Sequence, residues 1–446
     1  MKENDLTLAP IKSLIRKIAL PVSIGFFFNT MYNVVDTFFA GQISTVALSA
    51  LGISFPVFFM IIIFDAGIST GTTSVIANIL GEKNILKAKK YSAQAISFGF
   101  FVSIIVTILG LTFSPYIFKL LGATGEYLDV ALIYMNTIFC GSIFFILISV
   151  INSTLQASGD TKTYRNFLIG GFFLNVILDP WFLYGGFGLP PMGIRGIALA
   201  TVVVEFIGCI YIFYKASKSG LITKETFTHL KPDLKIFREI AGQAIPASLN
   251  MATIGIGIFV ITYFISQFGE KAVAAYGIAT RIEQIVLLPT IGLTIAALSI
   301  VGQNNGAKKY ERIKETLKLC LRYGLTIMSV GAVALFFTKR LLMTVFTKDL
   351  EVINIGSHYL GIACLIFLAY PLLFITISTL QGMKRPMYPV WIGLYRQILA
   401  PIVVFYFLVN VLDWGIDGIW WGIFGITWSA GIITILYARY VLKKIN

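Results

Sequence analysis

Charged residues are scarce in this sequence. Only 13% of its 446 residues are Asp, Glu, Lys or Arg, whereas 57% are hydrophobic. A soluble domain carries about 25% charged residues. The composition therefore excludes an ordinary soluble protein and indicates an integral membrane protein.

Cysteine and histidine are rarer still, with four cysteines and two histidines. The cysteines lie in apolar segments without a CxxC spacing, so we interpret them as small core residues rather than metal ligands or disulfide partners. His229 and His358 lie far apart in the sequence and do not suggest a metal site. The sequence also lacks a phosphate-binding loop and a nucleophile motif. We therefore expect neither an enzyme nor an ATP-driven pump, and no cofactor apart from a coupling ion.

The apolar segments are long enough to cross a membrane. A spanning helix needs about 20 residues, and backbone polar groups in lipid must be satisfied within the segment. Segments such as FVSIIVTILGLTF lack the alternation of a barrel strand, so we predict helices. Breaks at charged or Gly/Pro segments give twelve spans: 14–40, 50–80, 92–115, 129–154, 164–187, 194–215, 236–266, 274–302, 317–338, 353–380, 387–411 and 416–440.

The basic residues are distributed unevenly between the two sides of these spans. The two terminal segments and the even-numbered loops, taken with the adjoining span ends, hold 27 Lys and Arg, and the odd-numbered loops with their adjoining span ends hold 6. Arg281 and Arg396 lie inside predicted helices and complete the 35. By the positive-inside rule, both termini lie in the cytoplasm. The net charge of +14 is thus explained by topology rather than by nucleic-acid binding. We predict a multi-pass protein of the cell inner (plasma) membrane, and a monomer.

The sequence contains an internal repeat at an offset of 225 residues. LPVS at 20–23 matches IPAS at 245–248, and STLQ at 153–156 recurs at 378–381. Farther on, GIRGI at 193–197 matches GIDGI at 415–419 with a small slip. Six helices per half give both halves one orientation, as in parallel-repeat transporters. The predicted fold is therefore all-α, with twelve transmembrane helices in two pseudo-symmetric six-helix bundles: an N-terminal lobe at 1–219, a cytoplasmic linker at 220–235 and a C-terminal lobe at 236–446.

Two similar lobes favour a transporter that works by alternating access around a site between them. An ion gradient is then the natural energy source. Two intramembrane carboxylates belong to the first half alone, because Asp36 aligns with Ile261 and Asp179 aligns with Val404. Ionisable groups inside a membrane are costly and usually functional.

Other polar groups share helix faces with these carboxylates. Tyr32 and Asp36 are spaced i, i+4, as are Asn175 and Asp179, and Thr201 lies at a similar depth on the sixth predicted helix. Carboxylate, amide and hydroxyl oxygens suit a hard cation such as Na+, and neighbouring carboxylates can also hold a proton. The alternative is a polar network that only orders the bundle.

Two prolines and several further residues are weaker candidates. Pro180 follows Asp179 and frees a backbone carbonyl, and Pro21 interrupts the first helix, so both are candidate conformational positions. Four charged residues are candidates for lining the cleft or water: Asp65, Glu205, Arg281 and Glu283. Arg396 is a similar candidate, and LQASGDTKTYR is predicted to form a cytoplasmic turn.

With these residues the sequence resembles the multidrug and toxic compound extrusion (MATE) family over its full length. The resemblance is carried by YNVVDTFFAG in the first helix, LQASGDTK after the fourth and NVILDP in the fifth. It implies a bacterial branch whose amino-terminal lobe binds a cation at positions that match Asp36, Asn175, Asp179 and Thr201. Residues of that lobe also match Tyr32, Pro21 and Tyr134, the last a candidate for the cleft.

The resemblance implies export of cationic or amphipathic drugs in exchange for inward H+ or Na+. Another branch has acidic residues on helices 7 and 10. The segments PASLNMATIGIGIFVITYF and LGIACLIFLAYPLLFITIS of those helices carry none here, so the first lobe is expected to carry the coupling. A flippase or exporter of a lipid-linked or other metabolite, from the same superfamily, remains an alternative. A membrane enzyme or scaffold is the alternative that does not transport. The sequence names neither the substrate nor the coupling ion.

Overall fold

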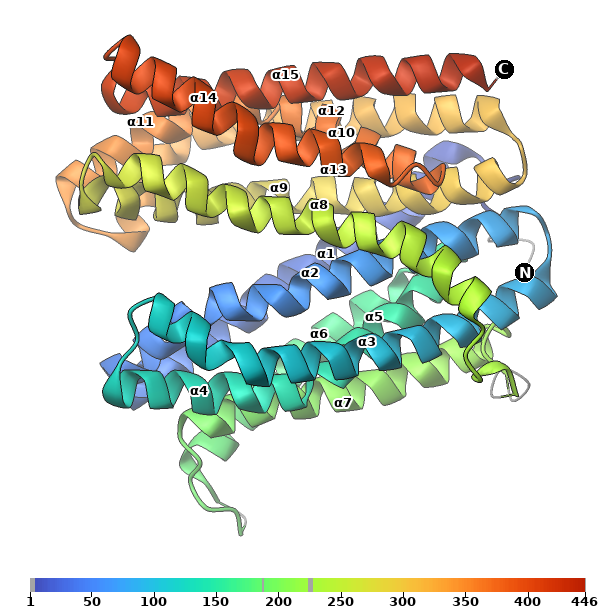
Figure 1. The fold of residues 1–446 in the computed structure, drawn as a ribbon, viewed down its shortest axis with the longest axis horizontal. Helices are drawn as coiled ribbons and strands as arrows, with labels where there is room; N and C mark the ends of the chain where they lie inside the picture. Colours follow the sequence, from blue (N-terminus) through green and yellow to red (C-terminus); the bar gives the residue numbers. More distant parts are fainter. Residues whose placement is uncertain (1–4, 187, 224–227, 446) are drawn as a thin grey trace. The chain divides into compact units, whose positions relative to one another are not determined.

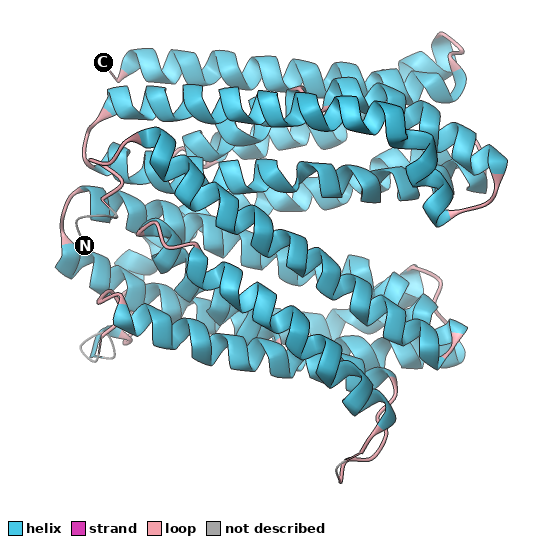
Figure 2. Ribbon diagram, turned by 180° about the vertical axis from the view of Figure 1, so that it is seen from behind, coloured by secondary structure: helices cyan, strands magenta, loops and turns pink. Residues whose placement is uncertain are grey.

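The computed structural model describes residues 5–186, 188–223 and 228–445. These residues form long helices joined by short loops (Figure 1, Figure 2), together with one isolated antiparallel bridge between Gly186 and Leu189. The helices are α1 (Ile11–Ile43), α2 (Thr45–Gly81), α3 (Ile85–Leu120), α4 (Gly125–Cys140), α5 (Ser142–Ala157), α6 (Lys162–Tyr184), α7 (Ile194–Lys218), α8 (Leu234–Ser266), α9 (Glu270–Gly306), α10 (Tyr310–Phe346), α11 (Leu350–Ile366), α12 (Ala369–Gly382), α13 (Met387–Leu394), α14 (Ala400–Tyr406) and α15 (Gly415–Lys444), with π-helical turns η3 (Tyr395–Leu399) and η4 (Phe407–Val411).

The twelve predicted spans match this set of helices. Within the described residues, ten helical segments are long and apolar enough to cross a membrane, and the segment 387–411 counts as one of them despite its π turns. Two further spans are bent pairs, α4 with α5 at 42° and α11 with α12 at 51°. Counting each pair as one span gives twelve, as the sequence predicts.

The two bends occupy matching places in the repeat. The first lies at Gly141 and the second at Phe367–Leu368, about 225 residues apart. A Cβ atom at Gly141 would lie 2.4 Å from Cγ2 of Val202 on α7. Only glycine at position 141 therefore lets the bend approach α7 this closely.

Contacts divide the described chain into two compact units. Unit 1 comprises the described residues up to Ser23 and the chain from Leu249 onward, and unit 2 comprises Ile24–Ser248. The chain thus passes from one unit to the other inside α1 and again inside α8, not at the linker. These units are defined by contacts within the chain and not by movement. The predicted lobes, 1–219 and 236–446, therefore stay a prediction.

In unit 2, α5 occupies a central place, since it packs against α2, α3 and α7. Glycines permit the closest approaches: a Cβ at Gly110 of α3 would meet the ring of Phe139 at 2.1 Å. The predicted turn after α5 is confirmed. Gly159 adopts a φ of 86°, and the Asp160 carboxylate accepts hydrogen bonds from the backbone N–H groups of Lys162 and Thr163 at the start of α6.

In unit 1, α9 packs against α10, α11 and α12. The segment before α1 docks on this unit, because Asn304 and Arg312 donate hydrogen bonds to the Leu6 carbonyl at 3.1 and 3.2 Å. Leu6 and Leu442 belong to the same hydrophobic cluster. Both ends of the described chain therefore lie at one end of unit 1.

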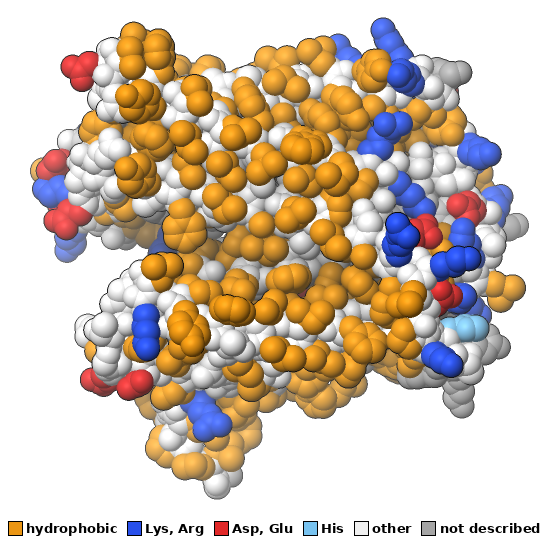
Figure 3. All heavy atoms as spheres, viewed as in Figure 1, with side chains coloured by type: hydrophobic (Ala, Val, Ile, Leu, Met, Phe, Trp, Pro, Cys, Tyr) orange, Lys and Arg blue, Asp and Glu red, His pale blue; other side chains and the backbone are white. Residues whose placement is uncertain are grey.

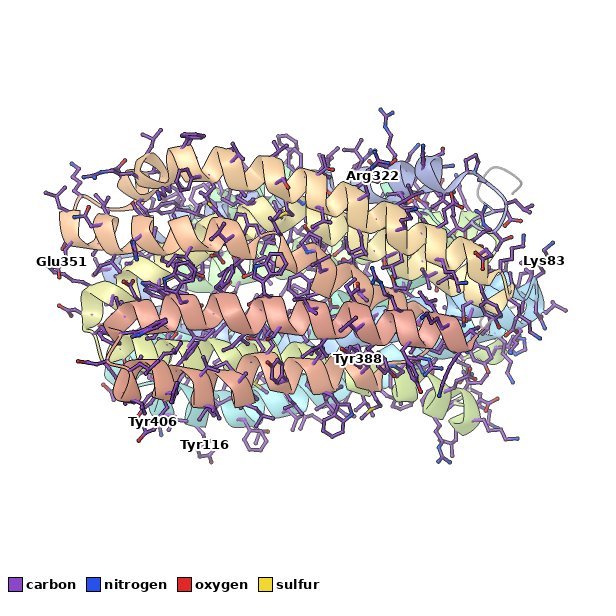
Figure 4. All side chains as sticks on the ribbon, turned by 90° about the horizontal axis from the view of Figure 1, so that it is seen from above. Lys83, Tyr116, Arg322, Glu351, Tyr388 and Tyr406 are labelled. Atoms are coloured by element: carbon purple, nitrogen blue, oxygen red, sulfur yellow. The ribbon has the colours of Figure 1, made fainter. Side chains whose placement is uncertain are left out.

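Charge and apolar surface are separated along the helices. In each unit, hydrophobic side chains cover the middle of the helices, and Lys and Arg side chains gather mostly at one set of helix ends (Figure 3). In unit 1, Glu351 lies at the end of the helices away from Arg322 (Figure 4), and its carboxylate accepts a hydrogen bond from Lys271 at 2.6 Å. This distribution fits helices that cross a membrane.

Candidate functional site: a buried carboxylate pair

The carboxylate site lies within unit 2, where α1, α6 and α7 meet. Asp36 lies seven residues before the end of α1, and Asn175 and Asp179 share one face of α6. Asp36 is 5% exposed, and Asn175 and Asp179 are fully buried. The helical spacing in the sequence predicted the shared faces, and folding brings the two faces together.

One amide joins the two carboxylates. The Nδ2 of Asn175 donates to Oδ1 of Asp36 at 3.0 Å and to Oδ1 of Asp179 at 2.9 Å. The Thr201 hydroxyl lies 3.4 Å from Oδ2 of Asp36 and 3.3 Å from the Ile197 carbonyl. Its single proton can serve only one of these acceptors at a time. The predicted set Asp36, Asn175, Asp179 and Thr201 is thus one hydrogen-bonded cluster.

Several oxygens in this cluster are left without a partner. Oδ1 of Asn175, Oδ2 of Asp179 and the hydroxyl of Tyr32 are buried and form no hydrogen bond. A buried polar atom without a partner costs about 1–3 kcal/mol, so native structures rarely leave several together. A bound cation, a proton or an ordered water would satisfy these oxygens.

The chemistry of the ligand set limits what binds. Carboxylate, amide and hydroxyl oxygens are ligands for hard cations. No group of three or more His, Cys, Asp or Glu side chains suited to a metal occurs among the described residues, and the cluster has only two carboxylates. The residues therefore fit a singly charged cation, Na+ or H+, better than a transition metal.

Charge gives a second reason for a cation. Within the described chain, no ion pair links Asp36 or Asp179 to a lysine or arginine. Two carboxylates bridged by one amide repel each other strongly in a medium of low dielectric. Binding one positive charge removes most of that repulsion.

The other predicted positions of this half lie nearby. Tyr134 on α4 is 8% exposed and close enough to Asp36 and Asp179 to interact with their charges. Pro180 lies inside α6, next to Asp179. Pro21 lies inside α1, two residues before the chain leaves unit 1. Roles for the two prolines in conformational change stay predictions.

The weaker candidates fall into two groups. Asp65 of α2 and Glu205 of α7 are half-buried in unit 2 and lie close enough for their charges to interact. Arg281 and Glu283 lie on α9 in unit 1, where Arg281 is exposed and Glu283 is buried. The structure therefore does not place these two in the carboxylate cluster.

Arg396 occupies a site of its own in unit 1. Its guanidinium lies 5.6 Å from the ring centre of Tyr370 and 5.5 Å from that of Phe374, and these two rings are stacked at 8°. It lies in the π-helical turn η3, just before Pro401. The sequence suggested the cation but not its aromatic partners, because their spacing from Arg396 follows no local pattern.

Comparisons with known proteins place this chain in a family. The MatE family model matches residues 21–181 and 246–412, one stretch in each half of the repeat. The probable multidrug resistance protein YoeA of Bacillus subtilis is 25% identical over 401 residues, covering 89% of this chain and 87% of the relative. The FAD transporter of Shewanella oneidensis is 28% identical over 405 residues, covering 89% and 88%. The probable multidrug resistance protein NorM of Thermotoga maritima is 26% identical over 428 residues, covering 92% and 88%.

Solved structures show the same fold. A MOP superfamily transporter from Pyrococcus furiosus superposes with a TM-score of 0.93 at 23% identity, covering 100% of this chain and 99% of that chain. A multidrug resistance MATE family transporter in an outward-facing conformation gives a TM-score of 0.92 at 23% identity, with the same coverage. The expected resemblance is thus confirmed, and the chain belongs to the MatE family of multi-pass membrane transporters and is not an enzyme.

Proposed function

We propose that this transporter exports amphipathic or cationic small molecules in exchange for an inward-moving cation, H+ or Na+. The observation that carries the proposal is the Asp36–Asn175–Asp179 cluster, which holds two carboxylates and two unpartnered oxygens inside unit 2. Such a cluster is costly unless a positive charge occupies it. No cofactor other than this coupling ion is proposed.

The substrate class is supported by the relatives. YoeA and NorM are named as probable multidrug resistance proteins, and MepA of Staphylococcus aureus, 25% identical over 413 residues, as a multidrug export protein. Proteins that accept many ligands use adaptable apolar surfaces. The 37 Phe, 20 Tyr and 10 Met residues of this chain provide material for such a surface.

The coupling would act through α1, which carries Asp36 and passes from one unit to the other. Cation binding at Asp36 and Asp179 would remove their repulsion and let α1 pack closely on α6. Release of the cation would restore the repulsion and favour a different bend of α1 near Pro21. Pro180 would provide a second adjustable point beside Asp179, because proline removes one helical hydrogen bond.

The orientation in the membrane is inferred from the distribution of Lys and Arg. We place the protein in the inner (plasma) membrane as a monomer, with both termini and the 220–235 linker in the cytoplasm. The Lys and Arg excess on that side supports this orientation.

A second candidate is export of an anionic metabolite. Arg396 lies over two aromatic rings and forms no ion pair with any described residue. The guanidinium lies close enough to Tyr370 for a hydrogen bond and close enough to Glu283 for their charges to interact. Its remaining donors would bind a phosphate or carboxylate group, which guanidinium groups bind well. The 28% identity to the FAD transporter of Shewanella oneidensis makes FAD a suitable probe. Gradient-driven movement of FAD, lost in Arg396→Gln and retained in Arg281→Gln, would favour this candidate over drug export.

Dye efflux from everted vesicles tests the main proposal, with a pH gradient and a Na+ gradient imposed separately. The wild type should respond to at least one gradient, and Asp36→Asn and Asp179→Asn should lose that response while remaining folded and inserted. Ile261→Val and Val404→Ile change the repeat mates and serve as matched controls. Wild-type efflux by either asparagine variant would refute coupling at this site.

A further inference from the structure

Unit 2 contains two further acidic side chains and a set of hydroxyl groups that lie outside the Asp36, Asn175, Asp179 and Thr201 cluster. We propose that Glu205 and Asp65, together with Tyr32 and the hydroxyls of α2 and α5, form a proton path from the Asp36–Asp179 pair to the cytoplasmic ends of the helices. The inference rests on the proposed function, because it assigns the route by which the coupling ion leaves that site.

The first step of the path lies one helical turn below the cluster. Tyr32 precedes Asp36 by four residues on α1, and Glu205 follows Thr201 by four residues on α7. Because α1 and α7 run in opposite directions through unit 2 (Figure 1), both shifts lead toward the same helix ends. Tyr32 lies close enough to Asp36, Asp179 and Glu205 to interact with their charges. Tyr32 therefore lies near both the carboxylate pair and the next carboxylate along the path.

The second step joins α7 to α2. The Glu205 and Asp65 carboxylates lie close enough for their charges to interact, and the Ser149 hydroxyl of α5 faces Asp65. α5 packs against both α2 and α7, so Ser149 lies between the two helices that carry the acids. The step is therefore placed by the packing of α5 on both helices, with water between the two acids.

The third step is a polar ladder along the α2–α5 contact, which we define as Asp65, Ser69 and Thr73 with Ser149 and Ser153. The α2 members follow one another at four-residue spacing, and so do the α5 members, so each set occupies one helix face. The Ser153 hydroxyl lies 3.1 Å from that of Ser69 and 2.6 Å from the Ser149 carbonyl. The Thr73 hydroxyl lies 3.5 Å from the Ser153 carbonyl.

The direction of the ladder matches the expected topology. α2 runs to Gly81 and α5 to Ala157, and both ends carry loops that the charge bias places in the cytoplasm. The ladder therefore continues the path from the level of Glu205 toward that side.

Unpartnered atoms mark the places where water would complete the path. The Tyr32 hydroxyl and Oδ1 of Asp65 are buried without a hydrogen-bond partner. Buried groups of this kind usually bind ordered water. Water between the side chains would let a proton move without large displacements of the helices.

The repeat shows that the acids are specific to this half. Asp65 aligns with Thr290 at the offset of 225, and Glu205 aligns with Thr427 at the offset of 222 set by the GIRGI and GIDGI segments. The scaffold thus tolerates a hydroxyl at both places. All four carboxylates of the set, Asp36, Asp65, Asp179 and Glu205, occur only in the half that carries the cluster. The shared scaffold therefore does not require an acid at these places.

The surrounding groups favour H+ over Na+ along this route. The titratable side chains that face Glu205 are Tyr32 of α1, Asp65 of α2, Tyr164 of α6 and Cys209 of α7 itself; Asp65 is faced by Glu205 and Tyr164. Among the described residues, neither acid forms an ion pair with a lysine or arginine. A Na+ ion needs several oxygens at every stop, whereas a proton needs one carboxylate or water at a time.

Each transfer conserves atoms and charge. A proton leaves the Asp36–Asp179 pair, and Glu205 accepts it directly or through Tyr32 and water. Glu205 then passes it to Asp65. From Asp65 the proton reaches cytoplasmic water through ordered water along the Ser69–Ser153 contact, because the backbone carbonyls that the Ser153 and Thr73 hydroxyls contact cannot relay a proton. No bond other than O–H is broken or formed.

The test separates the path from the site, because a path changes rates and a binding site changes equilibria. Glu205→Gln and Asp65→Asn should slow pH-driven efflux from proteoliposomes at least tenfold. They should retain drug-for-drug counterflow without a gradient, since that exchange moves no proton. In detergent they should also keep the pH dependence of drug affinity, which Asp36→Asn should lose.

Two further variants serve as controls. Glu205→Asp should restore part of the efflux with a displaced pH profile, and Cys209→Ala, one turn farther along α7, should behave as the wild type.

Three outcomes would overturn the path. Wild-type efflux rates in both Glu205→Gln and Asp65→Asn would show that the acids carry no proton. Loss of counterflow together with efflux would show that they only support the fold. Efflux by the wild type that follows Na+ alone would leave the proposed exchange intact but remove the proton path, whereas a wild type that ignores both gradients would refute the proposed function itself.

Discussion

Asn175 and Asp36 are 139 residues apart in the chain, yet the amide of Asn175 donates a 3.0 Å hydrogen bond to the Asp36 carboxylate. The same amide nitrogen donates to Asp179, one turn farther along α6. Both of its N–H groups are thus used to hold two acids in place, while its own oxygen stays unpartnered. Asn175 therefore orients the acids and leaves an acceptor free for a cation.

Replacing Asn175 by leucine should weaken the cation site more than it weakens the fold. The change removes the donor to both acids, and each buried acceptor left unpaired costs about 1–3 kcal/mol. We expect a lower melting temperature in detergent at neutral pH and partial recovery when the acids are protonated. Asn166→Leu alters an exposed asparagine of the same helix. It should change neither the melting temperature nor the cation dependence of transport. A variant with unchanged cation dependence of transport would show that Asn175 does not position the acids.

Gly141 provides a test of the bend between α4 and α5. Alanine there would place a Cβ 2.4 Å from Cγ2 of Val202, and overpacking of a core typically costs about 1–3 kcal/mol. Gly141→Ala should therefore lower the melting temperature, and Val202→Ala in the same chain should restore most of the loss. Gly170→Ala, where no neighbour lies within 4 Å of the new Cβ, is the matched control. Equal stability of Gly141→Ala and the wild type would show that α7 yields easily.

The sequence predicted the helices well because their causes are local. Long apolar runs and charged breaks fix where spans begin and end, and four-residue spacing places Asn175 and Asp179 on one face. The repeat also predicted that the halves share one plan, which the matching bends near Gly141 and Phe367 confirm.

Other features depend on contacts that no local pattern records. That Asn175 reaches Asp36 rather than another partner follows from the packing of α6 on α1. The passage of the chain between units at Ser23 and Ser248 lies inside continuous helices, where composition does not change. Ser149 and Ser153 lie in the hydroxyl-rich segment SVINST, and this segment was the available signal for a polar contact between α5 and α2.

The topology can be tested by cysteine labelling. In a background lacking Cys140, Cys209, Cys320 and Cys364, Lys235→Cys should be protected from a membrane-impermeant maleimide added outside intact cells, and Lys348→Cys should react. Both native side chains are exposed, so access depends on the side of the membrane. Reaction of position 235 from outside would reverse the predicted orientation.

Hydrogen bonds and an ion pair hold the linker against α3, and their strength depends on pH through the charge of Asp233. Lys90 lies 2.8 Å from Asp233, and Gln94 accepts a 2.8 Å hydrogen bond from the Asp233 backbone and donates to the Lys231 carbonyl at 2.7 Å. The hydrogen bond from Lys90, with those from the backbone N–H groups of Ile236 and Lys235, holds the pKa of Asp233 below its usual value. A lowered carboxyl pKa stabilises the folded state above the unfolded value, about 3.9, and this contribution is lost as the pH falls through the folded value.

Hydrogen exchange of residues 228–233 should therefore stay constant between pH 8 and about pH 5, once corrected for the intrinsic rate, and rise only in stronger acid. Asp233→Asn should raise exchange already at neutral pH, and Asp160→Asn, in the turn between α5 and α6, should not. Exchange that rises near pH 6 in the wild type would point to a different fastening group.

The coupling between cation and drug should be reciprocal. If cation binding lowers the affinity for the drug by some factor, drug binding must lower the affinity for the cation by the same factor. An exchanger needs this antagonism, because otherwise both ligands would move together. The structure offers a physical cause in the repulsion between Asp36 and Asp179. A bound cation removes this repulsion, which would otherwise favour a different packing of α1 on α6.

Coupling energies between sites are typically about 1–3 kcal/mol, roughly 5- to 150-fold in affinity. Drug affinity in detergent should therefore fall within that range as the pH is lowered, or as Na+ is added if Na+ is the ion, and Asp36→Asn should remove the dependence. The matched control is Ile261→Val at the repeat mate, which should keep it. Drug affinity that ignores both pH and Na+ in the wild type, while efflux still follows a gradient, would show that the carboxylate pair does not link the two ligands.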